Sequence, residues 1–166
     1  AFVIRFAAAP PPAALAPAKN EDVGGTDVGT PLALQSEGKR VLYVDDEESI
    51  VSLMTRLLER RGYRVSGFTD PGEALAAVRA DPAQFDLAVT DYNMPGMSGL
   101  DVARTLREIR ADLPVILISG YITDELQRDA PAAGVRELIY KPNTADDLCE
   151  AVARLAQTVG ETSKST

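Results

Sequence analysis

Five polar side chains stand at the ends of short apolar runs, at positions where they can do chemistry together. They are Asp45 and Asp46 after the first run, Asp91 after the third, Ser119 at the end of the fourth and Lys141 after the fifth. If the runs are parallel strands, their carboxyl ends meet at one edge of a sheet and bring these side chains together. Acids gathered in this way repel one another, and a divalent cation relieves the repulsion. Because the donors are hard oxygens, they predict a Mg²⁺ site rather than a zinc site.

The chemistry that this set can do is transfer of a phosphoryl group to a carboxylate. An ionised Asp91 is already a nucleophile and can form an acyl phosphate without a separate general base. Phosphoryl transfer depends on positioning and neutralisation of charge, and Mg²⁺, Lys141 and the Ser119 hydroxyl can supply both. For any single acid the alternative is a structural role, as a helix cap or at the end of a loop.

The composition excludes several other kinds of site. The 166 residues contain no histidine and one cysteine, Cys149, so histidine-ligated zinc, serine–histidine triads and an intrachain disulfide cannot form. Such low cysteine usage is typical of a reducing compartment. The net charge of −8 argues against a nucleic-acid-binding surface, which requires a basic patch. No apolar stretch reaches the ~18 residues that suggest a membrane span.

The elements that must position these side chains alternate regularly from Lys39 onward. Apolar runs that indicate strands cover 41–44, 63–68, 86–90, 114–119 and 135–140. Amphipathic stretches predict helices over about 47–61, from Asp70, from Ser98, over about 123–133 and over about 145–158. Five strands alternating with five helices predict an α/β domain with a parallel sheet covered on both faces.

Particular residues mark the ends of these helices. Gly62 is expected to stop the first helix. Asp70, Ser98 and Thr144 each have the chemistry of an N-terminal cap. Pro131 should end or bend the fourth helix, which therefore has the weakest pattern.

Residues 1–38 differ from the rest of the chain. In AFVIRF, residues 1–6, the side chains alternate as in a strand, but no neighbouring segment offers it a partner. We interpret it either as the last strand of an upstream domain or as a chain end with chance alternation. Residues 7–37 are rich in Ala, Pro and Gly and have the composition of a linker. Residues 159–166 are expected to form a short polar tail.

The segments around the five polar side chains resemble the receiver domain of two-component response regulators. The resemblance covers about 39–158 and includes VLYVDDEES, DLAVTDYNMPGMSGLD, PVILISG and AGVRELIYKP. It implies a flavodoxin-like, doubly wound sheet of five parallel strands in the order 2-1-3-4-5, with five flanking helices. It also implies that the domain accepts a phosphoryl group and then switches a partner-binding face.

The resemblance assigns roles to the acids. Asp91 matches the phospho-acceptor, which also contacts the metal. Asp46 matches the direct ligand of Mg²⁺, and Asp45 matches the acid that binds the metal through water. The backbone carbonyl of Asn93 matches the further ligand.

The resemblance assigns a second set of residues to the switch. Ser119 matches the hydroxyl that turns toward the phosphoryl group, and Lys141 matches the lysine that pairs with it. The bond from Lys141 to Pro142 matches one that is typically cis in the family, and it is of the X–Pro type in which the cis form costs least. Leu138 stands where the family often has an aromatic switch residue, which puts the readout in doubt. Tyr140 lies at the same strand parity and is either a partial substitute or an ordinary core or edge aromatic.

The resemblance also implies partners. The expected phosphodonor is a histidine kinase or a histidine phosphotransfer protein. The sequence allows, without showing, a homodimer through the face formed by 123–133, 135–140 and 145–158. The opening AFVIRF resembles the final strand of a histidine-kinase ATP-binding domain, so we interpret the chain as the carboxyl-terminal receiver of a hybrid sensor kinase. We expect a cytoplasmic segment that contacts neither nucleic acid nor membrane.

Two alternatives remain open at this stage. A pseudo-receiver would fold in the same way and act by protein binding alone. A Mg²⁺-dependent aspartyl phosphatase would need a second Asp two residues after a nucleophile at the first strand, where this chain has Glu47. For the segment itself we expect no enzymatic activity beyond self-phosphorylation and slow self-dephosphorylation.

Overall fold

The computed structural model describes residues 3–6, 38–141 and 145–161, with side chains described as far as Gln157. Its elements are β1 (Val3–Arg5), β2 (Arg40–Val44), α1 (Glu48–Glu59), β3 (Arg64–Phe68), α2 (Pro71–Ala80), β4 (Leu87–Asp91), α3 (Gly99–Ile109), β5 (Val115–Ser119), α4 (Asp124–Ala132), β6 (Val135–Tyr140) and α5 (Ala145–Glu161).

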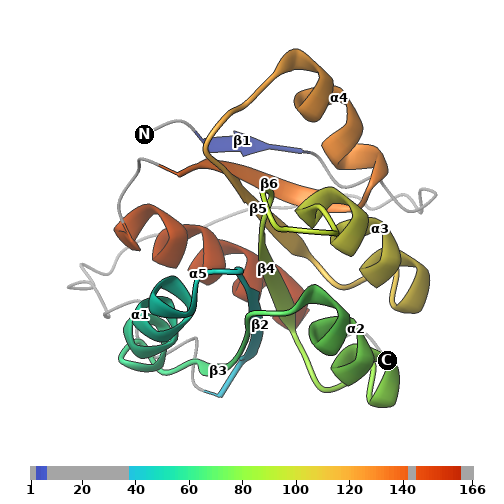
Figure 1. Ribbon diagram of the computed structural model, residues 1–166. Coiled ribbons are helices and arrows are strands. Elements are labelled where there is room, and N and C mark those ends of the chain that lie inside the picture. Colours follow the sequence, from blue (N-terminus) through green and yellow to red (C-terminus); the bar gives the residue numbers. More distant parts are fainter. Residues whose placement is uncertain (1–2, 7–37, 142–144, 162–166) are drawn as a thin grey trace, which may run out of the picture.

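The elements form one sheet with helices on both faces (Figure 1). The strand order is β1-β6-β5-β4-β2-β3, and every pair except β1 with β6 is parallel. Counted without β1, this is the predicted order 2-1-3-4-5, so the doubly wound fold is confirmed. The predicted number of strands is too small by one, because β1 adds a sixth, antiparallel strand at the edge of β6.

Alternate residues of each strand contribute to two separate cores. On β2, Val41 and Tyr43 pack with α1 and α5, whereas Leu42 and Val44 pack with α2 and α3. All five residues of β4 and all five of β5 are buried, which explains why the central strands are nearly uninterrupted apolar runs.

The helix ends follow the side chains that mark them in the sequence. Asp70 accepts a hydrogen bond from the backbone N–H of Glu73, and Ser98 forms a capping box at the start of α3. Gly62 has a φ of 89° directly after α1, a conformation that favours glycine. The cap predicted at Thr144 lies outside the described residues. The helix α5 extends to Glu161, so the predicted polar tail starts too early.

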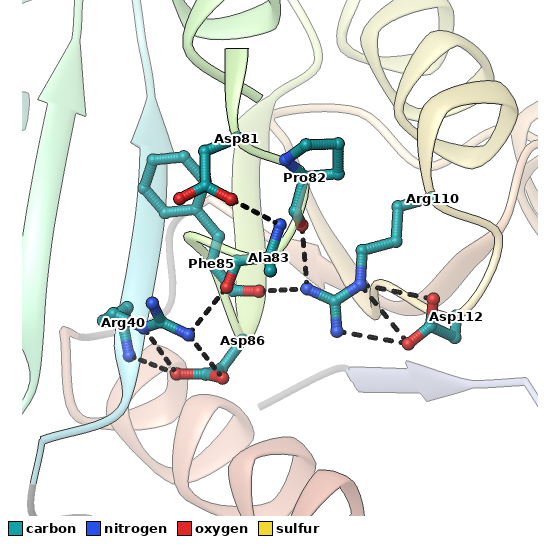
Figure 2. Close-up of polar contacts among 8 residues, drawn as sticks. All are labelled: Arg40, Asp81, Pro82, Ala83, Phe85, Asp86, Arg110 and Asp112. Carbon is teal, nitrogen blue, oxygen red and sulfur yellow. Dashed lines mark hydrogen bonds and ion pairs between the residues drawn. The ribbon is translucent and has the colours of Figure 1, made fainter. Parts of the chain in front are cut away.

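At the amino-terminal edge of the sheet, two arginines hold the segment between α2 and β4. Arg40 binds Asp86 through its backbone N–H at 2.8 Å and donates from Nη2 to the carbonyl of Ala83 at 2.7 Å (Figure 2). Arg110 donates from Nη1 to the carbonyls of Pro82 and Phe85 and pairs with Asp112 at 3.1 Å (Figure 2). These bonds provide donors for backbone carbonyls that lie between α2 and β4, outside the strands. Among the residues described, no helix is long and apolar enough to cross a membrane.

Candidate functional site

The fold gathers most of the predicted side chains at the carboxyl-terminal edge of the sheet. Asp45 directly follows β2, Asp91 is the last residue of β4, Ser119 is the last of β5, and Lys141 follows β6. Asp45, Asp91 and Ser119 are 1%, 2% and 0% exposed, so all three are fully buried polar residues. Buried carboxylates are costly unless they are paired, and their partners therefore decide what the site can do.

The Asp91 carboxylate is held from two sides. Its Oδ1 accepts a hydrogen bond from Lys141 Nζ at 3.0 Å, and its Oδ2 accepts one from the backbone N–H of Asn93 at 2.9 Å. A carboxylate oxygen is the nucleophile that forms an acyl phosphate. The two contacts fix the position of the Asp91 carboxylate at the end of the central strand.

Asp45 lies on the other side of the same ammonium group. Its Oδ2 is 3.7 Å from Lys141 Nζ, and its Oδ1 accepts a hydrogen bond from the backbone N–H of Glu47 at 3.0 Å. Burial raises the pKa of Asp45, and the negative charges of Asp91 and Asp46 add to this, against the lowering by the Glu47 N–H and Lys141. One lysine is therefore shared by two buried acids, and negative charge remains in excess.

Lys141 responds to the same excess charge. Partial burial on its own lowers the pKa of Lys141, but the hydrogen bond to Asp91 and the charges of Asp45, Asp91 and Asp46 outweigh it, so the pKa is raised. The lysine stays protonated at neutral pH. It is thus available to neutralise a further anionic group.

The predicted metal ligands are only partly brought together. Within the ranges that the structure describes, no three or more Asp, Glu, Cys or His side chains are grouped as a metal site. Asp46 and Asn93 are exposed, beside the buried pair of Asp45 and Asp91. The donor chemistry nevertheless fits a hard divalent cation, because carboxylate oxygens predominate and a single lysine leaves the acids under-neutralised.

The Ser119 hydroxyl is turned toward the backbone that follows it. Its Oγ donates to the carbonyl of Tyr121 and accepts from the Tyr121 N–H at 3.2 Å. The Tyr121 side chain itself is 77% exposed. In this arrangement Ser119 is bound to the β5–α4 connection, and its hydroxyl would have to turn to reach a group on Asp91.

Comparison with known proteins identifies the family. Residues 41–153 match the family model described as the response regulator receiver domain. The chain belongs to this family. The chemotaxis protein CheY-3 of Vibrio cholerae is 34% identical over 128 residues, which cover 74% of this chain and 95% of that protein.

Solved receiver domains have the same fold. A CheY-like receiver domain protein from Methanospirillum hungatei superimposes with a TM-score of 0.70 at 29% identity, over 75% of this chain and 98% of that one. A Borrelia burgdorferi complex described as CheX-CheY-BeF3-Mg²⁺ matches with a TM-score of 0.66 at 24% identity, over 70% and 88% of the two chains, and supports the fold alone. The chain spans a quarter or less of its first curated relatives, at 25%, 17% and 16% of their lengths.

The family membership states the general function of the domain. A receiver domain accepts a phosphoryl group in two-component signalling, which implies a histidine kinase or a phosphotransfer protein as its donor, and receiver domains generally bind Mg²⁺. The alternatives of a pseudo-receiver and of an aspartyl phosphatase are not favoured.

The proposed switch position of the receiver domain lies inside the core. Leu138 is fully buried in the cluster that contains Leu117 and Leu126, so its side chain does not reach the surface. Tyr140 is half-buried at the end of β6. The Lys141–Pro142 bond ends outside the described residues.

Two features of the receiver site were missed by reasoning from sequence. The carbonyl of Tyr121 holds the Ser119 hydroxyl, and a backbone acceptor has no signature in residue type. Gly99, the first residue of α3, packs so closely on the Asp91 carbonyl that any side chain there would collide with it. The glycine that directly follows the Ser98 cap was the available signal for this contact.

Proposed function

We propose that Asp91 is the residue of this receiver domain that takes the phosphoryl group. The observation that carries the proposal is the pairing of its buried carboxylate with Lys141 Nζ at 3.0 Å, with Asp45 on the other side of the same ammonium. This pairing fixes the Asp91 carboxylate in position and places a cation where a phosphoryl group would arrive. Of the two buried acids that share this lysine, Asp91 makes the closer contact, at 3.0 Å against 3.7 Å for Asp45.

The chemistry follows from this geometry. A carboxylate oxygen of Asp91 attacks the phosphorus of a phosphohistidine, the new P–O bond forms, and the P–N bond breaks with its electron pair passing to the imidazole. Lys141 moves from the carboxylate to the phosphoryl oxygens, and the Ser119 hydroxyl leaves the Tyr121 carbonyl to donate to them. The added charge of about −1.5 to −2 is the force that draws these donors in.

We place Mg²⁺ beside the same carboxylates. The ligands would be Asp45, Asp46, Asp91 and the backbone carbonyl of Asn93. When bound, the ion would neutralise negative charge on the phosphoryl oxygens during transfer. The geometry supports this placement, because two buried carboxylates share the single ammonium group of Lys141.

The test uses intact-mass spectrometry of the full chain with Mg²⁺ and acetyl phosphate. We expect one phosphoryl adduct, lost in Asp91→Asn and on removal of Mg²⁺ with a chelator. The matched control is Asp86→Asn, the same substitution at the opposite edge of the sheet, which should label as the unmodified chain does. Labelling that persists in Asp91→Asn would overturn the assignment.

The finer partner assignments belong to the same proposal. The face formed by α4, β6 and α5 is the surface through which we expect a homodimer, and the segment is expected to act in the cytoplasm without contact to nucleic acid or membrane. The position as the carboxyl-terminal receiver of a hybrid kinase stays a prediction, as does the kinase origin of residues 1–6.

A further inference from the structure

The outer edge of β6 is occupied by a strand from the far end of the chain. The strand β1 pairs with β6 in antiparallel register, with Val3 opposite Ile139, Ile4 opposite Leu138 and Arg5 opposite Glu137. The backbone N–H of Phe6 extends the pairing by donating to the carbonyl of Arg136 at 2.9 Å. Figure 1 shows β1, in blue, along the edge of the sheet that β6 would otherwise present to solvent. An open strand edge is a template for pairing with another chain.

The two faces of β1 match the two faces of β6. Ile4 and Phe6 pack on the core cluster that contains Leu138, and Val3 packs on the cluster that contains Ile139. Side chains alternate along a strand, so a slip by one residue would move these contacts to the wrong faces. The apolar pattern of residues 3–6 therefore matches the faces of β6 and disfavours a slip by one residue.

A buried acid on β6 adds a charged element to the register. Glu137 is 3% exposed, and its carboxylate binds Arg154 of α5 at 2.8 Å and 3.3 Å. Its Oε1 also lies 3.8 Å from Nε of Arg5, the residue directly opposite on β1. The acid therefore favours a basic residue at this one position of an incoming strand.

The docking of β1 is weaker than the pairing of the inner strands. Val3, Ile4 and Phe6 are only half-buried and Arg5 is exposed, whereas every residue of β4 is buried. Residues 7–37 join β1 to the receiver domain, so docking is intramolecular and has an effective concentration on the order of millimolar. Because its effective concentration is high, we expect β1 to be docked at rest. Because it has few buried contacts, we expect it to be able to open.

We propose that β1 is a built-in cover of the β6 edge that keeps the α4–β6–α5 face closed to a second copy of the chain. The edge accepts an extended segment with apolar residues flanking a basic one, and residues 3–6 of the same chain fill it. When β1 lifts, the same edge becomes available for dimer formation. The inference rests on the proposed use of this face, but it does not depend on which residue is phosphorylated.

The test compares full-length variants without any phosphodonor. Ile4→Asp places a charge against the core and should release β1, and the matched control is Leu53→Asp, where the leucine is 52% exposed on α1. In Ile4→Asp we expect amide hydrogen exchange over 135–140 to be faster by about tenfold or more, with exchange over 87–91 unchanged. Sedimentation equilibrium should then show a concentration-dependent dimer, whereas the unmodified chain and Leu53→Asp stay monomeric with slow exchange in β6.

Three results would overturn the proposal. Unchanged exchange over 135–140 in Ile4→Asp would mean that β1 does not protect β6. An unmodified chain that is already a dimer, and that dissociates in Ile4→Asp, would mean that β1 docks on a second copy. Faster exchange in a chain that stays monomeric would mean that the uncovered edge is not a dimer surface.

A second variant tests the register through Glu137. Arg5→Glu sets two acids opposite each other and should accelerate exchange in β6, whereas Arg5→Lys should restore protection. Equal exchange rates in the two variants would show that Glu137 does not favour a basic residue at position 5. Failure of these tests would leave Asp91 labelling intact, and failure of Asp91 labelling would leave β6 protection intact, so the two proposals are separable.

Discussion

The two ends of the parallel strands, called here the amino-terminal and carboxyl-terminal edges of the sheet, carry the same kinds of charged residue but neutralise them differently. At the amino-terminal edge two acids have an arginine each, Arg40 for Asp86 and Arg110 for Asp112. At the carboxyl-terminal edge Asp45 and Asp91 share Lys141. One edge is balanced and holds the fold together, and the other carries negative charge that a cation or a rearrangement must offset.

The pKa shifts express this difference. The pKa of Asp86 is lowered, because its hydrogen bonds and ion pair with Arg40 outweigh the effect of burial, and the pKa of Asp112 is lowered by the bond to Arg110. The pKa of Asp45 is raised, chiefly by burial. An acid paired with an arginine and an acid of the proposed site are therefore distinguished by their surroundings and not by residue type.

The largest expected effect comes from removing the cation of the carboxyl-terminal edge. Lys141→Met should slow labelling by acetyl phosphate about a hundredfold, because a preorganised donor to the phosphoryl oxygens is lost. The matched control is Lys39→Met, the same change near Asp86 at the amino-terminal edge, which should label normally. Labelling rates followed by intact mass decide the matter, and a normal rate in Lys141→Met would break the comparison.

Removing Arg110, which binds two backbone carbonyls, should change the stability of the fold and not the rate of labelling. Arg110→Met should lower the free energy of unfolding by about 1–3 kcal/mol, because the carbonyls of Pro82 and Phe85 lose their side-chain donor, and it should leave labelling unchanged. Arg104→Met, which removes a half-exposed pair with Asp101, should stay within about 0.5 kcal/mol. Urea unfolding measures both. Equal losses in the two variants would show that Arg110 has no structural role of its own.

Some of this contrast is foreseeable from sequence. Buried parallel strands must be continuous apolar runs, so β4 and β5 are plain in the sequence. The carboxyl ends of β4 and β6 bring Asp91 toward Lys141. The caps at Asp70 and Ser98 follow from local hydrogen bonding and are confirmed.

Other features depend on contacts between segments far apart in the chain. The pairing of β1 with β6 joins residues more than a hundred positions apart, and no local pattern specifies such a partner. Arg110 acts on the carbonyls of Pro82 and Phe85, and backbone acceptors are the same for every residue type. The direction of the Ser119 hydroxyl is set in the same way, by the carbonyl of Tyr121.

Neutralising one acid at each edge should change stability in opposite directions. Asp45→Asn removes a buried charge that Lys141 only partly offsets and should raise the free energy of unfolding by about 1 kcal/mol. Asp86→Asn removes a well-paired charge and should lower it by about 1 kcal/mol. Urea unfolding at neutral pH gives both values, and a shared sign would contradict the proposed difference between the edges.

The smallest effect is the pH dependence of these two variants. A raised folded-state pKa means that Asp45 takes up a proton as pH falls through that pKa, so its penalty is relieved and the advantage of Asp45→Asn disappears. A lowered pKa means that the contribution of Asp86 is present above its unfolded-state value and is lost at more acid pH. As the pH falls, the free energy of unfolding of Asp45→Asn should therefore approach that of the unmodified chain from above. That of Asp86→Asn should approach it from below, at a lower pH.

The most direct test of the central claim is to map the phosphorylated residue in the unmodified chain. After incubation with Mg²⁺ and acetyl phosphate, peptide fragmentation by tandem mass spectrometry should place the phosphoryl group on Asp91, with Asp45, Asp46 and Asp86 unmodified. A phosphoryl group on any other acid, or none at all on a folded chain, would contradict the account.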